Sequence, residues 1–264
     1  MLFKNHITIL LLLAILFFSC NEKKESRSNL ITEKTVIKNS YANGFKITKT
    51  ASSIELDINS PWPNSDKTYS YLLLTKEQTN KYPDNKDQFE TIITIPVEKV
   101  IVTSTTHIPA LELLGVEHTL VGFPGTDYVS SEKTRTLIDN KKIRDLGKNE
   151  GLNTEVLLDL KPDLVVGFGV DGNNKSLETI KKSHIPVIYN GDWVEKSPLA
   201  KAEWIKFFGV LFNKEKKADS IFTAIENNYN QAKLLATKVN NKPKILCGAM
   251  HKDVWYLPSS KSPE

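Results

Sequence analysis

Hydroxyl, carboxylate, imidazole and aromatic side chains gather in four short segments, each of which follows a run of apolar residues. The candidate ligand contacts in these segments are Ser104, Thr105, Thr106, His107, Phe123, Tyr128, Phe168, Asp171, Asp192 and Trp193. If the apolar runs are parallel strands, their carboxyl ends meet at one edge of the sheet, where open α/β sheets bind ligands. Side chains of these types suit a polar organic chelate. Each residue taken singly is also explained as a turn residue or a helix cap.

A glycine motif in the third segment offers a second interpretation. Residues 167–172 read GFGVDG, and Asp192 lies twenty residues beyond Gly172. This spacing matches the dinucleotide-binding fingerprint. However, Asn173 and Asn174 follow, so no helix begins where a pyrophosphate would need its N-terminus. A mobile ligand loop is the more economical interpretation, and a Rossmann-like enzyme outside the cytoplasm stays as the alternative.

Sequence signals for metal binding and for catalysis are weak. The histidines beyond the first twenty residues are widely spaced and form neither HxH nor HExxH, and the chain contains no P-loop and no GxSxG motif. We therefore expect no metal site, no cofactor and no catalytic residue. His118 and His184 precede apolar runs and are predicted to be surface turn residues.

The first twenty residues indicate the compartment. Lys4 precedes an apolar run from Ile7 to Phe18, which is too short to span a bilayer and suits a secretory signal. The following Ser19 and Cys20 resemble a bacterial lipobox, in which the cysteine is lipidated. We expect a signal peptide over residues 1–19 and a protein anchored outside the cytoplasm through Cys20. A cleaved signal peptide with an incidental cysteine is the other interpretation.

Composition and charge narrow the class of protein. The chain has 264 residues, 40% of them hydrophobic, which is enough apolar surface to exclude disorder as the main state. Its 35 basic and 31 acidic residues leave a formal charge of +4, and the basic residues are dispersed. Nucleic acid is therefore not an expected partner. Lipidation of Cys20 would leave Cys247 unpaired, and its apolar neighbours predict a buried, inert thiol.

The elements that must position the candidate contacts follow from periodicity. Residues 41–95 alternate apolar and polar side chains as strands do. Residues 96–195 alternate short apolar strands with helices, including 108–114 ending at Gly115 and 154–160 capped by Asn153. Residues 198–239 are predicted to form one long helical stretch, kinked at Gly209 or Asn213, within a connector over 196–239. After Pro243, strands over 244–250 and 254–257 would begin another sheet.

These elements predict an α/β protein with a Rossmann-like lobe whose sheet is mainly parallel. The predicted organisation is a signal peptide (1–19), a lipid-anchored flexible tether (20–40), a β-rich extension (41–95), an α/β ligand-binding lobe (96–195), a long rigid connector helix (196–239) and only the start of a second α/β lobe (240–264).

Several segments resemble the solute-binding lipoproteins of ABC importers for iron chelates, haem and cobalamin. The matching segments are VEKVIVTSTTHIPALELLGV, LVGFPGTDY, LNTEVLLDLKPDLVVGFG, IPVIYNGDW and SPLAKAEWIKFFGVLF, and the N-terminal NGFKI and SPWPN resemble a Bacteroidetes version of the family. The resemblance implies a chelate held between two lobes and delivered to a permease, with Glu155 meeting an arginine of that permease. Most of the second lobe is missing, which leaves open a fragment or a single-lobe surface interaction module that has lost transport.

Overall fold

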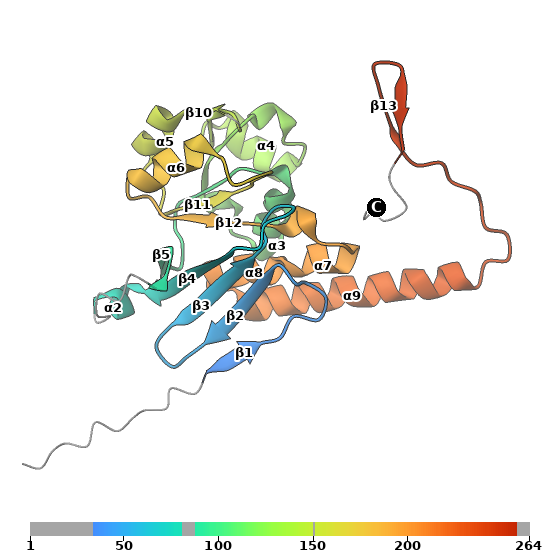
Figure 1. Cartoon of the computed structure of the whole chain (residues 1–264), viewed down its shortest axis with the longest axis horizontal. Coiled ribbons are helices and arrows are strands. Elements are labelled where there is room, and N and C mark those ends of the chain that lie inside the picture. The colour runs from blue at the N-terminus through green and yellow to red at the C-terminus, as the bar shows by residue number, and fades with distance from the viewer. Residues whose placement is uncertain (1–33, 81–87, 150, 258–264) are drawn as a thin grey trace, which may run out of the picture. The chain divides into compact units, whose positions relative to one another are not determined.

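Two five-stranded sheets form the framework of the protein, shown in Figure 1 as a computed structural model that describes residues 34–80, 88–149 and 151–257. These residues belong to one compact unit that begins at Lys34. The predicted signal peptide, Cys20 and most of the predicted tether lie outside the described residues.

The N-terminal sheet has the strand order β1–β2–β3–β4–β5. Its strands are β1 (Thr35–Ile37), β2 (Phe45–Lys49), β3 (Ile54–Asn59), β4 (Thr68–Thr75) and β5 (Thr91–Ile95). The first four are antiparallel, and β5 pairs parallel with β4 after the short helix α2 (Lys76–Thr79). Strands β2 to β5 lie within the region 41–95 that was predicted to be β-rich, and one face of their sheet is buried. Strand β1 was not predicted, because it lies in the segment 20–40 that was expected to be a flexible tether.

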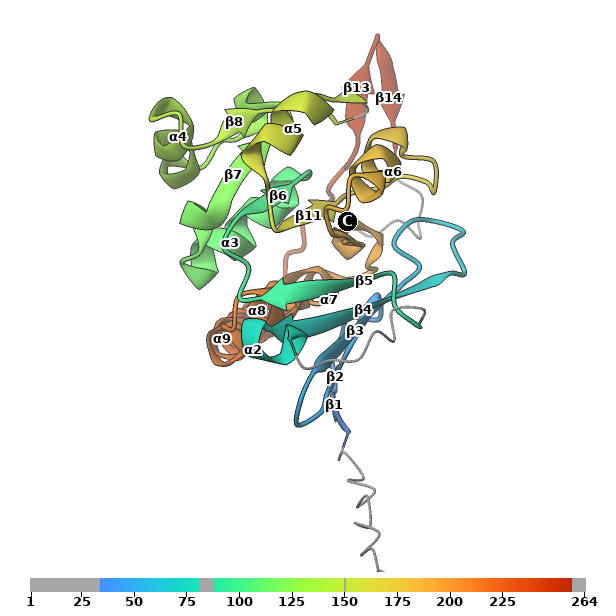
Figure 2. The same ribbon diagram turned by 90° about the vertical axis from the view of Figure 1, so that its left-hand side faces the viewer.

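The second sheet was predicted to be mainly parallel, and all of its strand pairs are parallel. Its order is β12 (Val187–Tyr189), β11 (Leu164–Gly167), β6 (Val100–Val102), β7 (Leu120–Phe123) and β8 (Arg144–Asp145). Figure 2 shows it with the helices that connect its strands: α3 (Ile108–Leu114), α4 (Glu132–Asp139), α5 (Thr154–Leu160) and α6 (Lys175–Lys182). Its strands β6 and β11 are wholly buried, which explains their unbroken apolar sequences.

Two helix ends match the local sequence signals. Helix α3 ends at Gly115, whose φ of 72° lies in the left-handed region that glycine adopts without a steric cost. Helix α5 begins after Asn153, whose side chain accepts a hydrogen bond from the Val156 N–H at 3.1 Å. The sequence therefore signals both boundaries locally, and Lys217 of a later helix also donates to the Leu114 carbonyl at the end of α3, at 3.0 Å.

The helical stretch predicted over 198–239 is broken twice, and one break falls at Asn213, where a kink was predicted. The chain forms α7 (Pro198–Glu203), α8 (Ile205–Leu211) and α9 (Glu215–Thr237). The first break is at Trp204, and the second contains Asn213 with a positive φ of 53°. The breaks allow α8 to bury nearly its whole length in the core, whereas α9 is exposed beyond Glu226.

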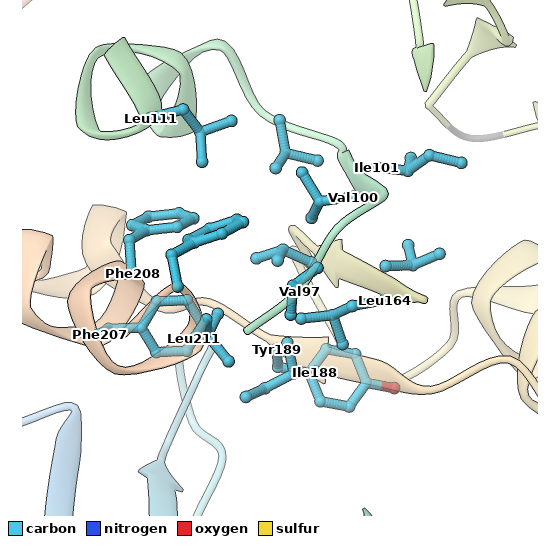
Figure 3. Packing of buried hydrophobic residues seen from close by; sticks show 14 of the residues in the cluster. Val97, Val100, Ile101, Leu111, Leu164, Ile188, Tyr189, Phe207, Phe208 and Leu211 are labelled. Carbon is cyan, nitrogen blue, oxygen red and sulfur yellow. The ribbon is translucent and has the colours of Figure 1, made fainter. Parts of the chain in front are cut away.

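The aromatic residues of α8 reach the parallel sheet. Figure 3 shows Phe207, Phe208 and Leu211 packed near Val97, which precedes β6, and near Val100, the first residue of β6. The Val97 N–H also donates to the Leu211 carbonyl at 3.0 Å. Helix α8 is therefore part of the core that supports β6 and the segment that follows it.

The prediction of a strand over 244–250 is wrong for most of that range. Only β13 (Ala249–His251) forms, paired antiparallel with β14 (Val254–Tyr256), and residues 243–248 are not a strand. Cys247 is exposed rather than buried. Apolar sequence specifies a buried strand only where another layer covers it, and the described residues provide no such cover here.

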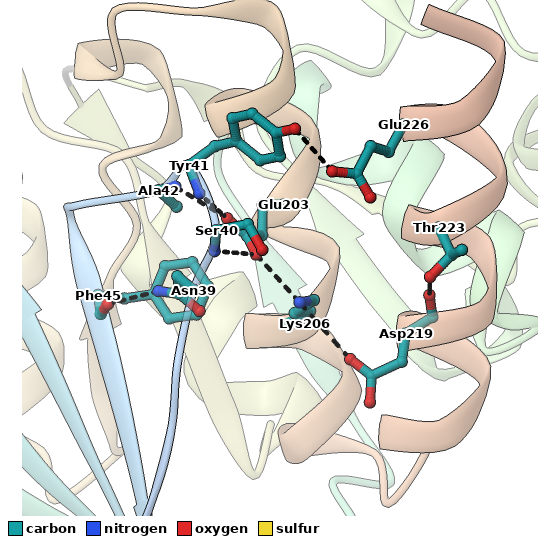
Figure 4. Close-up of polar contacts among 10 residues, drawn as sticks. All are labelled: Asn39, Ser40, Tyr41, Ala42, Phe45, Glu203, Lys206, Asp219, Thr223 and Glu226. Carbon is teal, nitrogen blue, oxygen red and sulfur yellow. Dashed lines mark hydrogen bonds and ion pairs between the residues drawn. The ribbon is translucent and has the colours of Figure 1, made fainter. Parts of the chain in front are cut away.

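Two buried carboxylates hold the beginning of the N-terminal sheet against the helices. The Glu203 carboxylate accepts hydrogen bonds at 2.8–2.9 Å from the backbone N–H groups of Ser40, Tyr41 and Ala42, and it pairs with Lys206 at 3.0 Å (Figure 4). Burial opposes ionisation of Glu203, yet these donors outweigh it and hold the pKa of the carboxyl below its usual value.

The second buried carboxylate, Glu195, binds the backbone of Asn43 and Gly44. Its carboxylate accepts from the N–H groups of Asn43 and Gly44 and from the indole of Trp204. A Cβ on Gly44 would lie 2.7 Å from the Trp204 ring, so only glycine fits there. The N-terminal sheet is thus fixed to the segment that follows β12.

Candidate ligand-binding site

The four segments with candidate contacts meet at the carboxyl ends of the parallel strands. We call them the β6 loop (103–107), the β7 loop (124–128), the β11 loop (168–174) and the β12 loop (190–193). The chain runs from β6 outward to β7 and β8, and then returns to β11 and β12 on the other side of β6. The switch point, where such sheets bind ligands, is therefore between the β6 and β11 loops. A hydrogen bond from the Phe168 N–H to the Thr103 hydroxyl, at 2.7 Å, joins these loops.

The structure divides the predicted contacts into two groups. Those with exposed or half-buried side chains are Ser104, Thr105, Thr106, Tyr128, Phe168, Asp171, Asp192 and Trp193. Tyr128 is the most open of the aromatic residues, with 82% of its surface exposed. In contrast, Phe123 is 2% exposed and His107 is completely buried. Ligand contact stays a prediction for both groups, and the two residues of the second group are buried at the site.

Two aromatic rings from neighbouring loops face each other. The Phe168 ring in the β11 loop and the Trp193 ring in the β12 loop have centroids 5.6 Å apart and planes inclined by 56°. The Trp193 indole N–H is buried and has no hydrogen-bond partner among the described residues. Together they offer an apolar surface with one polar donor, which is typical of sites for ring-containing ligands.

A buried polar cluster lies at the ends of β6 and β12. It consists of His107, Asn190 and Asp192. Both imidazole nitrogens, Asn190 Nδ2 and Asp192 Oδ1 are buried and lack a hydrogen-bond partner within residues 34–80, 88–149 and 151–257. Buried polar atoms are nearly always paired, so this cluster has unused capacity for water or ligand. Sequence reasoning missed Asn190, because an asparagine after a strand is usually a turn residue.

His107 is neutral in this environment. Burial lowers the pKa of its imidazole to about 4, although the Asp192 charge and the Asn190 side chain both act to raise it. Its ring also lies 5.6 Å from that of Phe208 in α8. The site therefore has an uncharged imidazole beneath it at physiological pH.

A cavity of about 220 Å³ adjoins Asp192. Its walls come from the β6 loop, α3, α7, α8, α9 and the β12 loop. The lining is mostly apolar and includes Trp204, Phe208 and Leu113, whereas Thr106, Asp192 and Lys201 supply the polar groups. A mostly apolar cavity with a few polar groups is suited to hold part of an organic molecule.

The glycine motif of the β11 loop has packing functions. A Cβ on Gly167 would lie 2.7 Å from Leu177, and Gly169 and Gly172 both lie against the Trp62 ring. The beginning of α6 is also occupied, because the Asn174 side chain accepts from the Leu177 N–H at 3.0 Å. Neither feature resembles a pyrophosphate cradle, which needs free N–H groups at the start of a helix.

Other predicted features are found at the surface. Glu155 is exposed in the first turn of α5, and His118 and His184 are exposed. Among the described residues, no three His, Cys, Asp or Glu side chains come together as metal ligands would. In the same part of the chain, no helix is long and apolar enough to cross a membrane.

Comparisons with known proteins agree with this fold. A family model for periplasmic binding proteins matches residues 100–262. An uncharacterized lipoprotein of Methanocaldococcus jannaschii is 28% identical over 185 residues, covering 67% of this chain and 44% of the relative. A second, uncharacterized protein of that organism is 28% identical over 171 residues, covering 61% of this chain and 51% of the relative. The chain thus spans about half the length of these relatives.

A solved structure shares the fold. The crystal structure of a periplasmic binding protein from Veillonella parvula matches with a TM-score of 0.55 at 19% identity, covering 79% of this chain and 60% of the other. The chain belongs to the periplasmic binding protein family, because the family model matches more than half of it. This is a family of solute-binding proteins rather than enzymes.

Proposed function

We propose that this chain is the ligand-binding part of a lipid-anchored solute-binding protein that serves an ABC importer outside the cytoplasm. One observation carries the proposal: the aromatic pair and the unpaired polar cluster lie together at the carboxyl ends of the parallel strands. A ligand there would satisfy buried polar atoms and cover the half-buried rings of Phe168 and Trp193 at once.

We further propose an iron chelate, either a siderophore or haem, or cobalamin as the ligand. All are large organic molecules with flat or ring-containing surfaces and polar edges. Phe168 and Trp193 suit the flat surfaces, and the hydroxyls of Ser104, Thr105 and Thr106 suit the polar edges. The resemblance of the loop sequences to importers of such chelates supports the same class.

Calorimetric titration of the purified protein with haem, cyanocobalamin and a ferric siderophore tests the ligand class. We expect one probe to bind, and Trp193→Leu to weaken that binding about tenfold because a ring contact is lost. Tyr229→Leu is the matched control, since Tyr229 is an exposed aromatic residue of α9 outside the four loops. If no probe binds, the ligand class is wrong, and if both variants lose affinity equally, the site is wrong.

The anchor is tested separately at Cys20. The relative with the wider coverage is called a lipoprotein, which supports the lipobox interpretation. Cys20→Ala should abolish acylation and release the protein from the membrane fraction, since lipid chains hold a protein far more firmly than its bare N-terminus. Retention of this variant on membranes would contradict anchoring through that residue.

The proposed docking to a permease is tested at Glu155. An exposed carboxylate at a helix N-terminus is well placed for an arginine of the partner. Glu155→Arg should reduce uptake in cells and leave ligand affinity unchanged, because the charge reversal acts only on docking. The control is Glu132→Arg, in the exposed first turn of α4. Equal losses of affinity and uptake would make Glu155 structural instead.

A further inference from the structure

The SPWPN turn of the N-terminal sheet reaches the ligand-binding loops of the parallel sheet. It follows β3, and its Trp62 is only 8% exposed. The Trp62 ring meets the Tyr189 ring edge to face, with centroids 5.1 Å apart and an interplanar angle of 88°, and it lies 5.6 Å from the Tyr69 ring. Tyr189 is the last residue of β12. This aromatic cluster therefore joins a turn of one sheet to the carboxyl end of the other.

The backbones of two loops approach this turn closely. A Cβ on Gly169 would lie 3.2 Å from Trp62 Cε3, and a Cβ on Gly172 would lie 3.4 Å from Trp62 Cζ2. On the β12 loop, a Cβ on Gly191 would lie 2.9 Å from the Pro61 Cα. Glycine at these positions leaves the space that the turn occupies.

Each of these glycines is close in sequence to a predicted ligand contact. Gly169 follows Phe168, and Gly191 precedes Asp192 and Trp193. The β11 loop is otherwise open to solvent, with residues 170–173 exposed. The buried Trp62 ring lies against this loop at Gly169 and Gly172.

We infer that Trp62 is a positioning residue of the ligand site, which holds the β11 and β12 loops in the arrangement that faces the ligand. The inference rests on the proposed function, since it assigns the N-terminal sheet to the same site. Without the ring, both loops would move over a cavity, and binding would have to order them first. We call this proposed role of the SPWPN turn, which restricts the motion of the β11 and β12 loops, the clamp.

Hydrogen–deuterium exchange without any ligand tests the clamp. Trp62→Ala should raise amide exchange in peptides covering 168–174 and 190–193 about tenfold, while exchange in β2 and β3 stays unchanged. Trp62→Phe should restore most of the protection, because a ring still fills the space. The readout is local, so a merely global loss of stability would not produce it.

Phe45→Ala is the matched control. Phe45 is also a buried aromatic residue of the N-terminal sheet, but its ring lies 4.8 Å from that of Trp204 rather than on the loops. If Phe45→Ala loosens the same two loops as much as Trp62→Ala does, or if Trp62→Ala leaves them protected, the clamp is refuted. Urea unfolding of each variant establishes that it is folded.

A binding measurement separates this inference from the proposed function. With haem as the probe, Trp62→Ala should weaken binding about tenfold, and Trp62→Phe should bind nearly as the wild type does. If the wild type binds haem and Trp62→Ala binds it equally well, the positioning role is refuted. If the wild type binds none of the probes, the proposed ligand class fails, and the exchange experiment still decides whether Trp62 clamps the loops.

Discussion

Lowering the pH from 7.5 to 5 should weaken the folded state through His107. The imidazole is completely buried, and neither ring nitrogen has a hydrogen-bond partner among the described residues. The charged form therefore has little to replace its hydration. Burial lowers the pKa of His107 to about 4, against about 6.5 in the unfolded chain, although the nearby Asp192 and Asn190 oppose the shift.

The sign and size of the effect follow from proton linkage. Between pH 6.5 and 4 the unfolded chain binds a proton at His107 that the folded protein does not bind, so acid favours unfolding. At pH 5 the free energy of unfolding is lower than at neutral pH by about 2 kcal/mol, and this loss levels off at about 3 kcal/mol below pH 4. The contribution of neutral His107 to the free energy of unfolding is therefore complete above pH 6.5 and is lost as the pH falls.

The assay is urea unfolding of the wild type and of His107→Gln at pH 7.5 and pH 5. Carboxyls with lowered pKa, such as Glu203 and Asp145, also destabilise both proteins in acid, so the comparison uses the difference between them. The wild type should lose about 2 kcal/mol more than the variant between the two pH values. Equal losses would refute the reasoning and show that His107 becomes protonated in the folded state. His107→Leu provides a second titration-free variant.

Three substitutions test the structural roles of single residues by urea unfolding. Glu203→Gln should lower the free energy of unfolding by about 3 kcal/mol, because the buried N–H donors and Lys206 lose their charged acceptor. A change near zero would mean that the carboxylate is dispensable. Asn153→Ala should cost about 1 kcal/mol through loss of the α5 cap, unless another acceptor replaces it. Gly115→Ala should cost about 1 kcal/mol, since its φ of 72° is unfavourable for alanine, and an unchanged midpoint would contradict this.

Local sequence signals predicted the parallel part of the fold well. Strand and helix alternation depends on neighbouring residues, and the ends of α3 and α5 depend on Gly115 and Asn153, which act within one helical turn. The grouping of the four loops at one edge also followed, because parallel strands place all their carboxyl ends together. These features were predictable because the residues that determine them are close together in the sequence, or because parallel strands always place their carboxyl ends at one edge.

Features set by distant contacts were not predictable in this way. A kink at Asn213 was predicted, whereas no local signal indicated the break at Trp204, and both breaks bury the aromatic residues of α8 against the start of β6. The apolar run around Cys247 predicted a buried strand, yet burial depends on a covering layer that sequence periodicity does not encode. Ligand contact by His107 stays a prediction, but its complete burial was not predicted, because it depends on packing against Phe208 far along the chain.

The glycine motif illustrates why a pattern must be interpreted with its three-dimensional neighbours. In a dinucleotide site, glycines leave space for a pyrophosphate at the start of a helix. Here the space beside Gly167 is filled by Leu177, and the space beside Gly169 and Gly172 is filled by Trp62. A nucleotide could occupy that position only by displacing a ring that is nine-tenths buried. The same spacing of glycines therefore allows close packing here, between the β11 loop and the SPWPN turn, instead of nucleotide binding.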